Sequence, residues 1–147
     1  MSGLVLKLGP KERIMINGVV MENGDRRTRL NILTPGANVL RMRDAIHPEE
    51  VTTPVRRVVY VAQLVLAGEA TERDGSEQLL RGIDQLKFVF SDPQSREHLD
   101  TARVAVTENR FYQALKALRA LLPREELLLE RAARRGLLPE HGNELPV

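Results

Sequence analysis

The chain has 147 residues, of which 42% are hydrophobic and 29% charged, so it is long enough for one core or two small subdomains. It has no cysteine, which excludes disulfide bonds, thiolate metal sites and a cysteine nucleophile. The net charge of +2 hides an asymmetry, because residues 1–46 hold eight basic and four acidic side chains. This surplus favours an anionic partner for residues 1–46, although a solvated basic surface has the same composition.

Residues 1–46 have the sequence pattern of short strands joined by tight turns. "LVLKL" (4–8) alternates, with its leucines on one face and Val5 and Lys7 on the other. Asn17-Gly18 favours a type I′ turn between two apolar segments, and "ENGD" and "TPG" supply two further turns. We therefore predict a basic antiparallel unit of about five short strands, arranged as a meander or a small barrel.

Two of these predicted strands carry arginines in alternation with apolar residues. In "RRTRLNIL" (26–33), strand alternation places Arg27 and Arg29 on the same face. In "NVLRMRDAI" (38–46), the same rule places Arg41 and Arg43 together. Arginine suits phosphates and base edges, because its planar guanidinium donates two parallel hydrogen bonds. The alternative is an open sheet face on which basic side chains discourage aggregation.

Beyond residue 47 the apolar residues recur at helical spacing, which predicts a helical bundle over 47–135. Thr53 is expected to cap a first helix that stops near Gly68, and Ser76 to cap the second. Asp92-Pro93 and Pro123 are expected to begin later helices.

The last segment, 136–147, has two prolines and no apolar period, so we predict a flexible tail. The predicted fold class is therefore α+β. It comprises a basic β-strand unit over 1–46, a helical bundle over 47–135 and the tail.

Catalytic and metal-binding patterns are missing from the sequence. The three histidines, His47, His98 and His141, have no second ligand at metal spacing, and no nucleophile elbow or phosphate-binding glycine loop occurs. We therefore expect a binding protein and not an enzyme, with neither a metal nor a cofactor. No segment has the length of a membrane span or the pattern of a signal peptide, so we expect a cytoplasmic protein without a membrane contact.

The aromatic residues restrict the kind of nucleic-acid binder. All of them lie beyond residue 59, so the β unit lacks the stacking platform of RRM, cold-shock and OB-type proteins. Contact with RNA would depend on basic groups, and the following side chains are the candidates: Lys7, Arg27, Arg29, Arg41, Arg43, Arg56 and Arg57. Arg56 and Arg57 belong to this set because cations near a helix N-terminus oppose the helix dipole, which suggests an anionic partner.

The stretches "KERIMING", "ENGDRR", "HPEE", "TTPVRR" and "FYQALKALRALLPRE" resemble the bacterial flagellar biosynthesis repressor FlbT family along nearly the whole chain. The resemblance implies a post-transcriptional regulator that acts on the 5′ untranslated region of flagellin mRNA, alongside the small regulator FlaF. In some bacteria the family promotes flagellin production, so the resemblance leaves the sign of regulation open.

Residues 4–18 and 39–46 are also similar in order and spacing to the CsrA-type RNA-binding regulators. This similarity places Arg43-Asp44 at the position of that family's RNA-contacting arginine and acid, with Leu4, Leu6 and Lys7 in the first strand. Leu8-Gly9 stands where CsrA-type proteins have a basic pair, and the helical extension has no counterpart in them.

Two functional hypotheses follow. The β unit binds the flagellin mRNA leader, or the helical half is a protein-interaction module for flagellin or FlaF. The short strands with free edges also favour a homo-oligomer, with a dimer as the simplest case.

Overall fold

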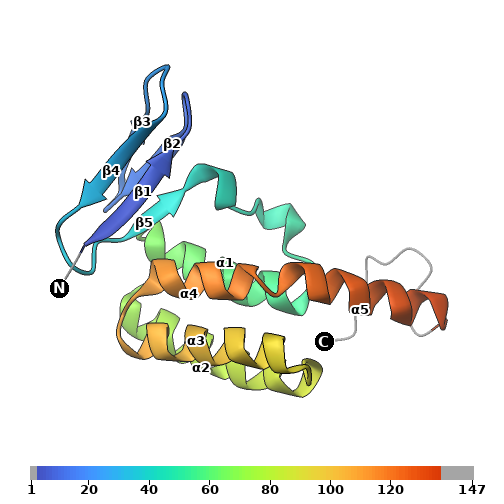
Figure 1. Ribbon diagram of the computed structural model, residues 1–147. Helices are drawn as coiled ribbons and strands as arrows, with labels where there is room; N and C mark the ends of the chain where they lie inside the picture. The colour runs from blue at the N-terminus through green and yellow to red at the C-terminus, as the bar shows by residue number, and fades with distance from the viewer. Residues whose placement is uncertain (1–2, 137–147) are drawn as a thin grey trace.

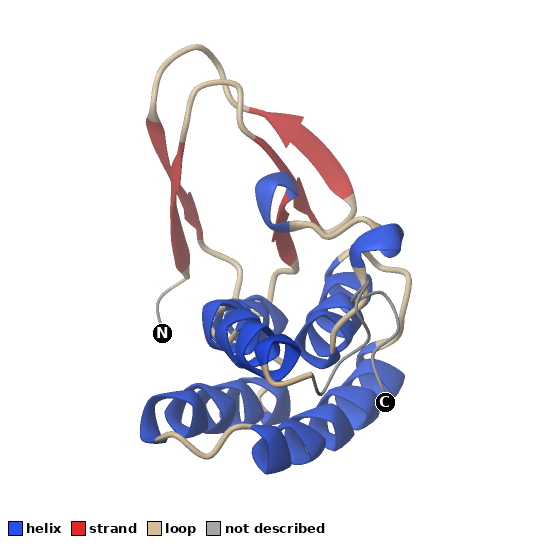
Figure 2. Cartoon of the chain, turned by 90° about the vertical axis from the view of Figure 1, so that its right-hand side faces the viewer, coloured by secondary structure: helices blue, strands red, loops and turns tan. Residues whose placement is uncertain are grey.

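The computed structural model describes residues 3–136, in which five short strands precede two 3-10 turns and five α-helices. The strands lie together at one end of the molecule and the helices at the other (Figures 1 and 2). The predicted α+β class, with antiparallel strands first and helices second, is confirmed. Of the predicted tail, all but Gly136 lies outside the described residues.

The strands form two small antiparallel sheets. In the first sheet, β1 (Leu4–Leu8) pairs with β4 (Thr28–Ile32). The second sheet has the order β3-β2-β5, from β2 (Arg13–Ile16), β3 (Val19–Glu22) and β5 (Val39–Arg41). Of the two arrangements that the sequence left open, the meander is therefore wrong. The turn after β3 does not return β4 to β3; instead β4 crosses to β1, where its apolar face meets the leucines of β1.

The β2–β3 hairpin turns at Asn17-Gly18, as predicted. Both residues have positive φ, 49° and 84°, which is the backbone that a type I′ turn requires. Asn17 also holds the hairpin to the segment before β5, since its side-chain oxygen accepts a hydrogen bond from the backbone N–H of Asn38 at 2.9 Å.

After β5 the chain makes the 3-10 turns η1 (Met42–Asp44) and η2 (Pro48–Glu50) and then enters the helices. Their bounds are α1 Pro54–Leu66, α2 Glu72–Val89, α3 Pro93–Thr107, α4 Phe111–Arg119 and α5 Leu122–Arg134. The Thr53 cap is confirmed, because its side chain accepts a hydrogen bond from the N–H of Arg56. Asp92-Pro93 begins α3 as predicted, and the Asp92 side chain accepts a hydrogen bond from the N–H of Ser95.

The predicted cap at Ser76 is wrong. Helix α2 begins at Glu72, and the hydroxyl of Thr71 accepts the hydrogen bond from the N–H of Asp74 at 3.1 Å. Gly75 lies inside the helix although glycine disfavours helical backbone, because its missing side chain lets α2 approach Val65 of α1.

Replacing Gly75 by alanine is therefore expected to destabilise the protein. The new Cβ would overlap Val65 Cγ2, and Val65 is buried and stiff at χ1. Overpacking should lower the free energy of unfolding by about 1–3 kcal/mol, which outweighs a helix-propensity gain of about 1 kcal/mol. Urea unfolding monitored by circular dichroism measures the difference. Gly24→Ala, where the added Cβ meets nothing within 4 Å, is the control and should change stability by less than about 0.5 kcal/mol.

The two sheets and the helices share one hydrophobic core. The apolar faces of β1, β2 and β5 lie in the same buried cluster as residues of α1 to α4. Glu125 of α5 is buried as well, and its carboxylate accepts a hydrogen bond from the N–H of Val55 at the start of α1, 2.8 Å away. A carboxylate at a helix N-terminus is favourable, so this bond fastens α5 to α1.

Candidate nucleic-acid interface

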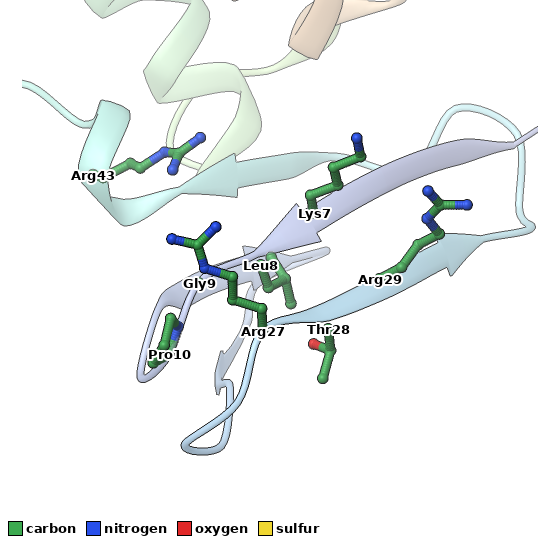
Figure 3. A pocket seen from close by; sticks show the side chains of 8 residues that line it. All are labelled: Lys7, Leu8, Gly9, Pro10, Arg27, Thr28, Arg29 and Arg43. Atoms are coloured by element: carbon green, nitrogen blue, oxygen red, sulfur yellow. The ribbon is translucent and has the colours of Figure 1, made fainter.

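A groove of about 440 Å³ runs along the edge of the β unit where β1 ends and β4 begins. Its lining residues, drawn in Figure 3, are Lys7, Leu8, Gly9, Pro10, Arg27, Thr28, Arg29 and Arg43. Four of these eight residues are basic and none is acidic. Four of the candidate residues from the sequence are therefore brought together by the fold: Lys7, Arg27, Arg29 and Arg43.

The pairing of β1 with β4 is what assembles these cations. Lys7 lies directly opposite Arg29 in the antiparallel register, so both side chains project from the same face of the two-stranded sheet. Arg27 stands just before β4 and rises from the same side of the ribbon, and Arg43 approaches from η1 (Figure 3). The predicted alternation of β1 and β4 is thus confirmed for Lys7 and Arg29, whose neighbours Leu6, Leu8 and Leu30 face the core.

The surplus charge of the β unit is concentrated at this groove. Each of the four acidic side chains of residues 1–46 lies in an ion pair. The pairs are Lys11–Asp25 at 2.9 Å, Arg13–Glu22 at 2.9 Å, Arg41–Glu12 at 2.6 Å and Arg119–Asp44 at 3.7 Å. Among the ion pairs of residues 3–136, none includes Lys7, Arg27 or Arg29. These three exposed cations therefore form an uncompensated positive surface.

Arg41 is not on this surface, which corrects the prediction that it shares an exposed face with Arg43. Its side chain is 8% exposed, and its Nε and Nη2 donate to the two carboxylate oxygens of Glu12 at 2.6 and 2.7 Å. Nη2 also donates to the carbonyl oxygen of Lys7 at 2.6 Å. Two of the three guanidinium nitrogens thus bond within the protein, and the side chain is buried, so Arg41 has a structural role.

Strand alternation fails here because β5 is only three residues long. All three of its residues are buried, and the chain turns into η1 at Met42, so Arg41 and Arg43 do not share a face. Arg43 is 62% exposed and lines the groove, with its Nε 3.8 Å from a Glu12 oxygen. At that distance the pairing is weak, and Arg43 can turn toward a ligand.

The sequence did not mark Glu12 or Asn23 as functional residues, but their side chains hold the loops that line the groove. Glu12 accepts a hydrogen bond from the N–H of Gly9 at 3.0 Å as well as the bonds from Arg41. The Arg41 hydrogen bonds, despite the opposing effect of burial, lower the pKa of Glu12 from 4.5 to about 2. Glu12 is therefore a carboxylate at neutral pH, and it fixes the loop that follows Lys7.

Asn23 ties the two loops of the groove together. Its side-chain nitrogen donates to the carbonyl oxygens of Gly9 at 2.7 Å and Arg26 at 2.9 Å, and its oxygen accepts from the Thr28 hydroxyl at 2.9 Å. The Asn-Gly turn signal marked this position in the sequence, but its side-chain contacts depend on β1 and β4 lying side by side.

Arg56 and Arg57 lie in the first turn of α1, outside this groove. Arg57 lines a separate hollow between α1 and α2 together with Arg81, Gln78 and Gln85, and no residue is common to the two hollows. The fold therefore does not join these two arginines to the cations of the β unit, and their contact with RNA stays a prediction.

The groove offers cationic and backbone groups and no aromatic ring. Phe90, Phe111 and Tyr112 are buried in the helical half. A ligand suited to this lining carries spaced negative charges, and the sugar-phosphate backbone of a nucleic acid has that character. In the described part of the chain no cluster of His, Asp or Glu could hold a metal ion, and no helix there is long and apolar enough to span a membrane.

Comparison with known proteins gives one family. The family described as "Flagellar protein FlbT" matches residues 4–129. The "Flagellum biosynthesis repressor protein FlbT" of Caulobacter vibrioides is 30% identical over 123 residues, covering 84% of this chain and 86% of that protein. The "Probable flagellum biosynthesis repressor protein FlbT" of Brucella abortus is 32% identical over 128 residues, which cover 87% of this chain and 83% of that protein. The protein of the same name from Brucella anthropi is 32% identical over 124 residues, which cover 84% of this chain and 80% of that protein.

No solved structure matches the chain. The similarity of the β unit to CsrA-type regulators is not shown by any of these comparisons.

Proposed function

This chain belongs to the FlbT family of flagellar proteins, which are regulatory repressors and not enzymes, and we propose that it binds the 5′ untranslated leader of flagellin mRNA. The groove where β1 ends and β4 begins is the proposed contact surface. Bound there, the protein would block ribosome entry or change the lifetime of the message, and it would act in the cytoplasm.

One observation carries this proposal. Lys7, Arg27 and Arg29 have no acidic partner within the described residues, while every acidic side chain of residues 1–46 is paired. Holding like charges close together without compensation disfavours the folded state, unless a polyanion provides the missing negative charge. Guanidinium groups from neighbouring positions can each donate two hydrogen bonds to a phosphate.

Binding of a labelled flagellin leader should weaken steeply with salt. Each neutralised phosphate of single-stranded RNA releases counterions and contributes about −0.7 to the slope of log K against log salt concentration. Contacts from about three to four cations predict a slope of roughly −2 to −3, or about a 20- to 50-fold loss of affinity between 50 and 200 mM salt. Fluorescence anisotropy at several salt concentrations measures the slope. A slope near zero, or no binding at 50 mM salt, would contradict the proposal.

The second candidate function is a protein-interaction module in the helical half. Phe88 of α2 is 93% exposed and is followed by exposed Val89, a placement that favours a protein contact over solvent. Flagellin or FlaF would be the partner. Co-purification of flagellin or FlaF that Phe88→Ser abolishes, together with no binding of the leader RNA, would favour this module over the mRNA regulator.

A further inference from the structure

Strand β3 is exposed to solvent although most of its residues are apolar. All four of its residues are exposed, although three of them are the apolar Val19, Val20 and Met21. Successive side chains of a strand point to opposite faces, so β3 exposes apolar groups on both. The strand contains no lysine, proline or bulge of the kind that protects natural sheet edges.

The backbone edge of β3 is free as well. β3 is the outer strand of the order β3-β2-β5, and the segment after it pairs with β1. The N–H of Asn23 donates to the carbonyl oxygen of Glu12 across from β2, at 2.8 Å. Alternation along the strand then turns the N–H and C=O groups of Met21 and Val19 toward β2, and those of Val20 and Glu22 toward the free edge.

We propose that β3 is a homodimer surface on which a second copy of this chain adds its own β3 in antiparallel orientation, about a two-fold axis at Val20. In this register Val20 exchanges both backbone hydrogen bonds with Val20 of the second copy. Val19 then lies opposite Met21, and Glu22 lies opposite Gly18. Every apolar side chain thus meets an apolar one, and no like charges face each other.

A second copy suits this edge better than an unrelated strand because the edge is complementary to itself under that symmetry. Pairing joins two three-stranded sheets into one sheet of the order β5-β2-β3-β3-β2-β5. The cationic groove belongs to the other sheet and shares no residue with β3, so it stays open in the dimer.

Sedimentation velocity on the full chain tests the dimer. Five paired residues on each copy bury less than the roughly 1,200 Å² of a standard interface, so we expect dissociation in the micromolar range, seen as a shift from monomer to dimer between about 1 and 300 µM. Val20→Lys should leave a monomer across this range. Val104→Lys is the matched control, because Val104 on α3 is 55% exposed and Val20 is 58% exposed, and it should dimerise like the wild type. Circular dichroism verifies that both variants are folded.

A cysteine cross-link provides a second test that does not depend on disruption. The chain contains no cysteine, so Val20→Cys and Val104→Cys each carry a single thiol. Directly opposite residues of an antiparallel pair have Cα atoms about 5.5 Å apart, within the range that a disulfide spans. Mild oxidation should convert Val20→Cys largely to a covalent dimer and leave Val104→Cys mostly monomeric. A wild-type chain that stays monomeric at 300 µM, or dimers that Val20→Lys does not weaken, would overturn the proposal.

Discussion

Reversing the charge of Lys7, Arg27 and Arg29 to glutamate should abolish binding of the flagellin leader at physiological salt. The three cations line one groove and lack acidic partners in the described part of the chain, so the change removes phosphate contacts and adds repulsion. With roughly 1 kcal/mol for each lost contact, we expect affinity to fall by at least about 100-fold. The thermal transition should stay near that of the wild type, because all three side chains are exposed.

The matched control is a second triple variant with the same change in net charge. Arg73, Arg131 and Arg135 are exposed in the helical half and line none of the grooves described above, and their replacement by glutamate should lower affinity far less. Equal losses in the two triple variants would mean that net charge alone governs binding, and the groove would not be the contact surface. An Arg41→Glu variant is unsuitable for this test, because it would leave two carboxylates in a buried position made for an ion pair.

Glu12→Gln should destabilise the protein at neutral pH, and the difference from the wild type should shrink in acid. Glu12 has a pKa of about 2 in the folded protein, against 4.5 ordinarily, because Arg41 stabilises its charged form. A depressed folded pKa gives stability that is fully present above pH 4.5 and is lost as the pH falls toward 2. Breaking such a pair should lower the free energy of unfolding by about 2–4 kcal/mol at pH 7. Urea unfolding of both proteins at several pH values between 2 and 7 measures the difference in their free energies of unfolding and shows whether it shrinks in acid.

Glu126→Gln is the control for this pH dependence. Glu126 is exposed on α5, one residue after the buried Glu125, and it should contribute less than about 0.5 kcal/mol at any pH. If Glu12→Gln were as stable as the wild type at pH 7, the Glu12–Arg41 pair would not hold the loop that follows Lys7.

The parts of the fold that depend on a few neighbouring residues were predictable. The turn at Asn17-Gly18 follows from the backbone that asparagine and glycine tolerate, and the cap at Thr53 from a hydroxyl that reaches a nearby N–H. Lys7 and Arg29 were placed on their correct faces because strand alternation needs no knowledge of the partner strand. In each case the determining interaction spans only a few residues.

The errors arise where distant segments decide the outcome. The cap predicted at Ser76 was wrong because α2 begins earlier and continues through Gly75. A glycine is favourable at this helical position because it lets α2 pack against Val65 of α1. Strand alternation predicted Arg41 to be a surface cation. In the fold its guanidinium is buried in an ion pair with Glu12, which lies 29 positions earlier in the chain.

The sequence by itself determined the α+β class, the concentration of basic residues in the first 46 positions, and the apolar faces of the strands and helices, because composition and periodicity encode these directly. The tertiary structure decided which cations share a surface. Pairing β4 with β1 places Arg29 opposite Lys7, while pairing β5 with β2 buries Arg41 beside Glu12. Both outcomes depend on contacts between residues far apart in the chain, and the alternation of side chains along one strand does not specify the strand with which it pairs.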